Sequence, residues 1–179
     1  MFSFLTRSQR RKALGERLYQ HCVSQARKPY FYSNFGVDDT PEGRFELISL
    51  HVSLFIRRLN REGEEGRDAA QELFDAMFRD MDHALREMGV GDLSVSKKIR
   101  ALAEAFYGDM KAYTPALDAR DKDLLSLALS QHVEHASTPE RKGLAEYMLA
   151  SESTLNEQAG PQLLTGNPPE FADSLLASA

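Results

Sequence analysis

The sequence predicts an all-α protein that folds as a single compact helical bundle of about six helices. Apolar residues recur three and four positions apart along most of the chain, which is the spacing of one helix face. Thr40-Pro41-Glu42 and Thr138-Pro139-Glu140 each place a capping hydroxyl, a proline and an acid where a helix begins. A length of 179 residues, 42% of them hydrophobic, suits one domain with a sizeable core.

Three helices are predicted in the first half of the chain. The first runs from about Ser8 to Ala26 and ends before Pro29, because proline disfavours helix in the residue that precedes it. The second runs from about Thr40 to Arg61 and is apolar on most sides, so we expect it at the centre of the packing. A short polar linker, residues 62–67, predicts that the third helix, from about Asp68 to Met88, returns antiparallel to the second.

Three further helices are predicted in the second half. Gly89 suits a left-handed C-terminal cap on the third helix. The fourth helix then runs from Val95 to about Tyr113, where Thr114-Pro115 ends it. The fifth is expected from about Arg120 to Ala136, and the sixth from Thr138 to about Leu155.

The domain organisation follows from where this pattern stops. We expect one helical domain over residues 1–159. Beyond it, Gly160 and three prolines interrupt the helical spacing. Residues 160–179 are therefore predicted to be a mobile C-terminal tail, with at most a short helix from Pro169 to Leu176.

Composition excludes several classes of protein. A net charge of −5 argues against a DNA-binding protein, because phosphate contacts need a dominant basic surface. Cys22 is the only cysteine, so no intrachain disulfide or cysteine-based zinc cluster can form, and we expect a reducing compartment. Charged residues interrupt every apolar run before the roughly 20 residues that a membrane span needs. The start of the chain lacks the residue order of a signal peptide, so we interpret the chain as complete and cytoplasmic.

The N-terminus carries a cluster of cations without acids. Three interpretations are open: contact with an anionic membrane surface, contact with ribosomal RNA, or simply a solvated helix start. The residues that would make a membrane or ribosome contact are Phe2, Phe4, Arg7, Arg10, Arg11 and Lys12.

Two short segments that contain histidine and acidic residues are the candidate metal-binding sequences. His132 and His135 lie three positions apart, and in Asp80-Met-Asp-His83 the histidine follows Asp80 with the i, i+3 acid-to-histidine spacing of di-iron bundles. The remaining inward-facing acids of such a centre are missing, which favours a structural or solvated role. No nucleophile elbow, phosphate-binding glycine loop or dinucleotide fingerprint occurs in the sequence. We therefore expect no enzymatic activity, no cofactor, no metal and no small-molecule substrate.

Two further features suggest apolar binding. Four aromatic residues lie within the six positions from Tyr30 to Phe35, in a connection without helical period, and either the core or a partner must cover them. Methionines usually fill gaps in a core, but exposed ones make adaptable apolar binding surfaces. The methionines concerned are Met77, Met81, Met88, Met110 and Met148.

A family resemblance rests on several ordered stretches of the chain. The most specific is Asp80-Met-Asp-His-Ala-Leu-Arg-Glu-Met-Gly-Val-Gly-Asp92, which is too long to arise by chance. The other stretches are Phe31–Glu46, Leu50-His51, Arg57-Arg58-Leu59, Gln71–Lys98, Ala105–Gly108 and Tyr113. In these stretches the chain resembles the ubiquinol–cytochrome c chaperone family, over roughly residues 10–150 and most clearly over 29–113.

This resemblance implies an all-helical assembly factor for respiratory complex III that binds newly made cytochrome b, without catalysis and without a cofactor. Mitochondrial members are described as acting near the ribosomal exit with a small partner protein. The short N-terminus resembles that of bacterial members, which implies a cytoplasmic location, peripheral at the inner face of the inner membrane. A metal-binding helical enzyme and a generic helical interaction scaffold are the alternatives.

We expect the client to bind the loop Phe31–Phe45 together with the nearby faces of the Thr40–Arg61 and Leu73–Met88 helices. Aromatic, leucine and methionine side chains would supply the apolar area, and charged side chains would form its rim. The residues predicted to bind the partner are Tyr30, Phe31, Tyr32, Phe35, Arg44, Phe45, His51, Asp80, Asp82, Arg86 and Glu87.

Overall fold

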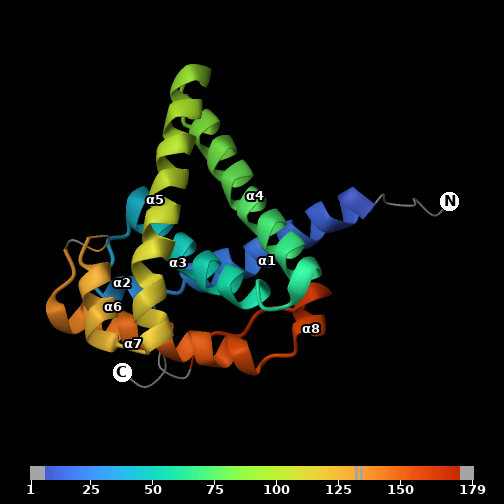
Figure 1. Ribbon diagram of the computed structural model, residues 1–179. Helices are drawn as coiled ribbons and strands as arrows, with labels where there is room; N and C mark the ends of the chain where they lie inside the picture. Colours follow the sequence, from blue (N-terminus) through green and yellow to red (C-terminus); the bar gives the residue numbers. More distant parts are fainter. Residues whose placement is uncertain (1–6, 132, 134, 174–179) are drawn as a thin grey trace.

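The computed structural model describes residues 7–131, 133 and 135–173, and every regular element in these ranges is a helix (Figure 1). The all-α prediction is confirmed, although the described residues form eight helices and not about six. The helices are α1 Arg7–Ala26, α2 Tyr30–Asn34, α3 Pro41–Leu59, α4 Gly63–Glu87, α5 Asp92–Ala119, α6 Lys122–Leu129, α7 Thr138–Glu157 and α8 Gly160–Leu164.

Helix α3 is the centre of the fold. It begins where the sequence predicts, with Pro41 as the first helical residue and Thr40 Oγ1 accepting a hydrogen bond from the N–H of Gly43 at 3.1 Å. Most of its side chains from Phe45 to Leu59 are buried, on all sides of the helix. The reason is that α1, α4, α5 and α7 all contact it.

Two arginines at the end of α3 join it to neighbouring helices. Arg58 is 7% exposed and donates from Nε to the carbonyl oxygen of Leu155 at 2.8 Å and from Nη2 to that of Gln158 at 2.7 Å. Arg57 Nη2 lies 2.8 Å from a carboxylate oxygen on α7 and 2.7 Å from one on α5. Because a buried guanidinium is costly without partners, these contacts hold the end of α7 in place against α3.

Helix α1 crosses α4 at close range. A Cβ atom built on Gly15 would stand 2.4 Å from the carbonyl oxygen of Glu72, which is closer than real Cβ contacts come. Glycine therefore lets the two backbones approach at this point. Beyond the crossing, Leu18 and Cys22 of α1 are fully buried.

Helices α4 and α5 form a hairpin that projects well beyond the rest of the molecule (Figure 1). We call its projecting part, residues 74–107, the arm. Gly89 in the connection between the two helices has a φ of +79°, the left-handed conformation predicted for it. No other helix lies alongside the outer end of the arm in Figure 1, so apolar residues there are covered from one side only.

Several helix boundaries differ from the predicted ones because tertiary packing outweighs local sequence. The prediction that Thr114-Pro115 ends α5 is wrong, since the helix continues to Ala119 with the proline inside it. Tyr113 and Ala116 on either side of the proline are buried, and their packing compensates for the missing backbone hydrogen bond. The next helix, α6, ends earlier than predicted, at Leu129.

The starts of α4 and α7 also depart from the predicted positions. Helix α4 begins at Gly63, so most of the predicted polar linker is helical. Helix α7 is capped one residue earlier than predicted, at Ser137, whose backbone N–H donates to Glu140 Oε2 at 2.6 Å.

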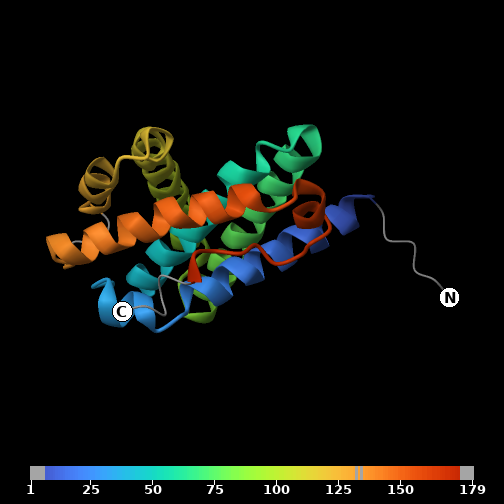
Figure 2. The ribbon, with the colours of Figure 1, turned by 90° about the horizontal axis from the view of Figure 1, so that it is seen from below.

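The C-terminal segment packs along the helices. Residues 165–173 follow α8, which the periodicity does not predict, and run between α1 and α7 (Figure 2). The side chain of Gln158 bonds to both the N–H and the carbonyl oxygen of Glu170 at 2.9 Å, and Phe171 is 6% exposed. Residues 160–173 of the expected tail are thus packed. Residues 169–172 are not helical, and the rest of the expected Pro169–Leu176 helix, apart from Asp173, lies outside the described residues.

The close crossing of α1 and α4 predicts opposite effects for the same substitution at two glycines. Gly15→Ala should lower the free energy of unfolding by about 1–3 kcal/mol, because the added methyl group separates the helices. Gly108→Ala on α5 should raise it by about 0.5–1 kcal/mol, since a Cβ atom there meets nothing within 4 Å. Urea denaturation followed by circular dichroism measures both, and equal effects at the two positions would contradict the crossing.

Candidate protein-binding surfaces

The aromatic connection is divided between core and surface. Helix α2 turns Phe31 inward and Phe35 follows it, so that they are 0% and 7% exposed, and Phe45 at the start of α3 is 8% exposed. Tyr30 and Tyr32 stay half-buried. Of the four rings in this connection, those of the two tyrosines are therefore the ones that a partner can reach. The five residues of α2 are too few to show a helical period, so the sequence alone does not indicate which rings turn inward.

Arg44 is an exposed neighbour of this connection. Its Nε lies 2.7 Å from Asp39 Oδ1, and the hydrogen bond lowers the pKa of the Asp39 carboxyl. Arg44, Asp39 and Tyr32 together line a shallow hollow beside Pro29. The pair contributes little to stability because both side chains are in solvent, so Arg44 is accessible to a partner.

His51 lies in the core, where a chain of hydrogen bonds satisfies it. Its Nδ1 lies 2.7 Å from the carbonyl oxygen of Leu47 and its Nε2 lies 2.8 Å from the Tyr147 hydroxyl. Since a carbonyl only accepts, Nδ1 donates, and the Tyr147 hydroxyl donates to Nε2 while its oxygen accepts from Gln25 at 2.9 Å. Burial lowers the pKa of His51 to about 4, so the imidazole is neutral. The rings of Phe31 and Phe171 enclose it at centroid distances of 5.2 and 5.0 Å.

Two carboxyl groups near the α3–α5 contact are also shielded from water. Burial raises the pKa of Glu46 to about 7, and the negative charge of Asp109 adds to that effect. Burial likewise raises the pKa of Asp109, which is 4% exposed, to about 6. Neither residue is predicted as a site from the sequence, because an isolated acid on a helix is usually solvated.

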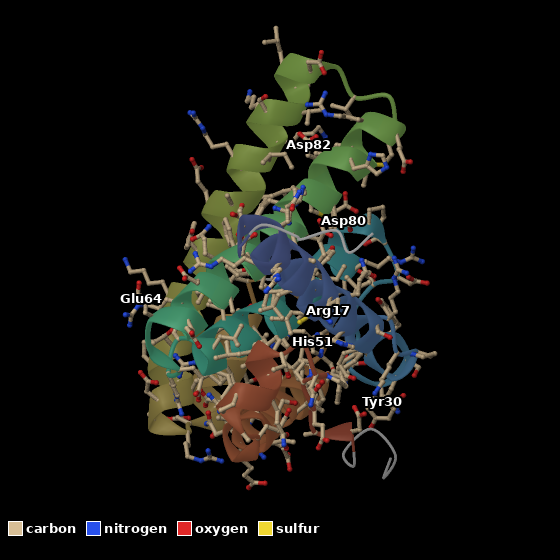
Figure 3. The ribbon with its side chains drawn as sticks, turned by 90° about the vertical axis from the view of Figure 1, so that its right-hand side faces the viewer. Arg17, Tyr30, His51, Glu64, Asp80 and Asp82 are labelled. Atoms are coloured by element: carbon tan, nitrogen blue, oxygen red, sulfur yellow. The ribbon has the colours of Figure 1, made fainter. Side chains whose placement is uncertain are left out.

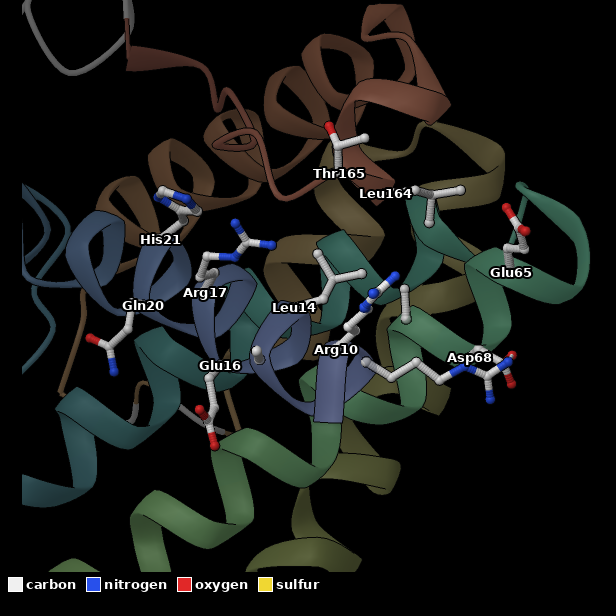
Figure 4. Close-up of a pocket in the computed structure, with 13 residues that line it drawn as sticks. Arg10, Leu14, Glu16, Arg17, Gln20, His21, Glu65, Asp68, Leu164 and Thr165 are labelled. Carbon is white, nitrogen blue, oxygen red and sulfur yellow. Dashed lines mark ion pairs between the residues drawn. The ribbon is translucent and has the colours of Figure 1, made fainter. Parts of the chain in front are cut away.

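A groove lies between α1, the start of α4 and α8 (Figure 4). It has a volume of about 1290 Å³, and Leu14 and Leu164 provide part of its apolar lining. Arg11 in the groove forms an ion pair with Asp68. Arg10 and Arg17 also line it, and neither forms an ion pair within the described part of the chain.

Some of the basic residues predicted to make a contact at the N-terminus line this groove. Arg10 and Arg11 lie at the groove and Lys12 is exposed on α1. Phe2, Phe4 and the side chain of Arg7 lie outside what the structure describes. The membrane or ribosome role of these residues stays a prediction.

The charged residues of α4 that are predicted to bind the partner lie one after another along the arm, from its base toward its outer end. Asp80 accepts a hydrogen bond from the Tyr19 hydroxyl at 2.8 Å, which ties the base of the arm to α1. Asp82 lies further along the arm than Asp80 (Figure 3). The ion pairs of the outer arm are Arg86–Asp82 at 2.6 Å, Arg86–Asp92, and His83–Glu87 at 3.1 Å. These exposed pairs brace the hairpin and neutralise much of the charge on its α4 side.

Four aromatic rings pack together at the base of the arm. The ring of Phe74 lies 4.6 Å from Phe78, 5.5 Å from Phe106 and 5.4 Å from Tyr107, measured between centroids. Phe106 is buried, Phe74 and Phe78 are half-buried, and Tyr107 is 58% exposed. We call these four residues the arm patch. An exposed cluster of this kind marks an interaction site more often than an isolated apolar residue does.

The end of the arm is also apolar. Met88 is 64% exposed and Leu93 is 92% exposed, on the two sides of the connection between α4 and α5. Of the other four methionines in residues 77–148, Met77 and Met148 are fully buried, and Met81 and Met110 are half-buried. Sequence periodicity places Met88 in line with the apolar face of α4, but it does not indicate that the side chain is exposed.

The predicted metal ligands and the cysteine are not gathered into one cluster in the described part of the chain. Within residues 7–131, 133 and 135–173, no group of three or more His, Cys, Asp or Glu side chains is placed to hold a metal ion. His132 lies outside these ranges, and His135 Nδ1 lies 2.5 Å from Asp38 Oδ2. Burial raises the pKa of the Cys22 thiol, which makes it a poor nucleophile. Among the helices described, none combines the length and apolar character needed to cross a bilayer.

Comparisons with known proteins give one consistent result. Residues 33–171 match the family described as Ubiquinol-cytochrome C chaperone. A solved structure described as the crystal structure of the Cbp3 homolog from Brucella abortus is similar, with a TM-score of 0.83 and 36% sequence identity. That similarity covers 96% of this chain and 94% of the other.

Two vertebrate relatives are more distant. Ubiquinol-cytochrome-c reductase complex assembly factor 1 of Xenopus laevis is 23% identical over 156 residues, which cover 86% of this chain and 78% of the relative. The Mus musculus protein described in the same way is 25% identical over 113 residues, which cover 63% of this chain but only 38% of its own length.

The buried histidine makes stability depend on pH. The pKa of His51 is about 4 in the folded protein, against an ordinary value of 6.5, so the unfolded chain binds the extra proton first as the pH falls. Between pH 7.5 and pH 5 this should remove about 2 kcal/mol from the free energy of unfolding.

Urea unfolding of the wild type and of His51→Gln at the two pH values tests this. The carboxyl groups of Glu46 and Asp109 have raised pKa values and act in the opposite direction, because they lose stability as the pH rises. Both carboxyl groups are present in the wild type and in His51→Gln. The difference between the two proteins in how the free energy of unfolding changes with pH therefore reports on the histidine alone. Equal slopes would contradict a neutral, buried His51.

Proposed function

The chain belongs to the ubiquinol-cytochrome C chaperone family, and from this premise we propose that it binds newly made cytochrome b and holds it until complex III is assembled. The family description names a chaperone, which supports a role that is not catalytic. The observation that carries the proposal is the match of residues 33–171 to this family, together with an exposed apolar surface on the arm.

A chaperone for a membrane subunit must offer apolar area to segments that lipid has not yet covered. Burial of apolar surface contributes about 25 cal/mol per Å², so a few hundred Å² gives reversible binding once the cost of association is subtracted. The arm patch suits this role because Tyr107 is exposed and Phe74 and Phe78 are half-buried. The arm can bind such a segment without opening the core around α3.

The predicted partner residues that solvent reaches complete the proposed surface. Tyr30, Tyr32 and Arg44 offer a second area of mixed apolar and basic character near the hollow beside Pro29. Asp82, Arg86 and Glu87 lie on the outer arm and would form a polar rim. We place the activity at the cytoplasmic face of the membrane that receives the client, with the basic N-terminus as a contact to the membrane or the ribosome.

Deletion of the gene should reduce assembled complex III and destabilise cytochrome b. Complementation with Tyr107→Asp should restore complex III poorly and lower the recovery of cytochrome b with the tagged protein by about ten-fold, because a carboxylate then occupies the arm patch. Leu127→Asp on α6 is the matched control, since Leu127 is 67% exposed and lies away from the arm.

The two parts of the proposal fail in different ways. Normal complex III in the deletion strain would overturn the assembly function. Full complementation by Tyr107→Asp would leave the function intact and remove the arm patch from it. Thermal melts of both variants, expected to match the wild type because both positions are exposed, exclude unfolding as the cause.

A further inference from the structure

We propose that the tip of the arm docks onto the surface of an anionic lipid bilayer. We define the arm tip as residues 88–100, which join α4 to α5 at the outer end of the hairpin (Figure 1). Its apex carries Met88 and Leu93, which are 64% and 92% exposed. Two apolar side chains this exposed at one projecting turn form an apolar area that the fold leaves uncovered, and with the charges beside it this area can contact a partner.

Three cations follow this apex along α5. Lys97, Lys98 and Arg100 are exposed, and no ion pair among the described residues involves them. Of the two acids that flank these cations along α5, Asp92 is paired with Arg86, and Glu104 lies one turn beyond Arg100. In a chain with a net charge of −5, this is a local excess of positive charge, and it is complementary to an anionic surface.

The order of these residues along the helix matches the layers of a bilayer. Lys97 lies four positions and Arg100 seven positions after Leu93, so both are on its face of α5. With a rise of 1.5 Å per residue, they stand about 6 and 10 Å behind the leucine. The headgroup layer is roughly 5–8 Å deep on each side of the hydrocarbon. A leucine at the edge of the hydrocarbon therefore places Lys97 among the lipid phosphates. Arg100 stands just behind this layer, and its long side chain tilts back toward the helix N-terminus and can reach the phosphates.

The shape of the arm favours a flat partner. The tip is the convex end of a two-helix hairpin, with no other helix beside it in Figure 1. A projecting tip can reach a plane without contact between that plane and the rest of the molecule. One or two apolar side chains with three cations predict weak and reversible binding, because stable anchoring requires stronger signals.

This inference does not depend on the proposed client. The arm patch at Phe74, Phe78, Phe106 and Tyr107 lies nearer the base of the hairpin than the tip does. Docking through the tip would hold the patch close to the membrane in which a membrane protein is inserted. The two contacts are separate, so variants can abolish one and spare the other.

Co-sedimentation of the purified full chain with vesicles tests the inference. The protein should sediment with vesicles of phosphatidylcholine mixed with phosphatidylglycerol, bind weakly to phosphatidylcholine alone, and dissociate as salt is added. Leu93→Asp should lower the partition coefficient by about ten-fold or more, because a charged group is moved toward hydrocarbon. Lys97→Gln and Lys98→Gln should each lower it by about five-fold.

Matched controls separate the tip from general charge and hydrophobicity. Lys111→Gln removes an exposed cation of α5 that lies away from the tip, and Leu127→Asp alters an exposed leucine of α6. Both should bind vesicles as the wild type does. Circular dichroism should show that Leu93→Asp keeps its helices, as expected for a side chain that packs against little.

Three results would overturn the inference. The first is a wild type that does not bind anionic vesicles. The second is equal binding by the wild type and Leu93→Asp. The third is a loss of binding in a variant with Arg10→Gln and Arg11→Gln but not in Leu93→Asp, which would assign the lipid contact to the N-terminus. If Leu93→Asp instead lowers cytochrome b recovery while the wild type ignores vesicles, the tip is a protein contact and lipid docking is excluded.

Discussion

The burial of α3 on nearly every side is the constraint on which the rest of the fold depends. Polar side chains of such a helix need partners inside the protein, because an unpaired buried polar group costs roughly 1–3 kcal/mol. His51 finds them in Leu47 and Tyr147, and Arg58 finds them in the carbonyl groups at the end of α7. Each of these bonds also positions a neighbouring element. The ring of Phe171, in the C-terminal segment 165–173, packs against the His51 ring. For His51 and Arg58, hydrogen bonding and packing are thus achieved by the same contacts, whereas the buried hydroxyl of Ser49 on α3 has no hydrogen-bond partner among the described residues.

The arm is the part of α4 and α5 that extends beyond their contacts with α3. Near their base both helices contribute buried residues such as Met77 and Phe106, while further out Met88 and Leu93 have only one neighbouring helix or none. The same two helices therefore contribute to the core at their base and leave apolar side chains exposed toward their outer end. Exposed apolar area of this kind suits the client binding that we propose.

The predicted partner residues fall into two groups, those buried in the core and those that solvent reaches. Phe31, Phe35 and His51 lie in the core, and Tyr30 and Tyr32 keep access to solvent. A cluster of aromatic residues has the same composition whether its rings turn inward or outward, so composition cannot distinguish the two. Tyr107, which we propose as a binding residue, is not among the residues predicted from the sequence, because its place in the family-like stretch Ala105–Gly108 does not reveal that the ring is exposed.

Local features of the chain were enough for the all-α class, the central place of α3, the helix start at Thr40 and the left-handed Gly89. Helical period and capping act between residues three or four positions apart, and such relations can be read directly from the order of residues. The passage of α5 through Pro115, the packing of Phe171 and the exposure of Leu93 were not readable in this way. Each depends on which distant segments cover a given face, and that is settled when the whole chain packs.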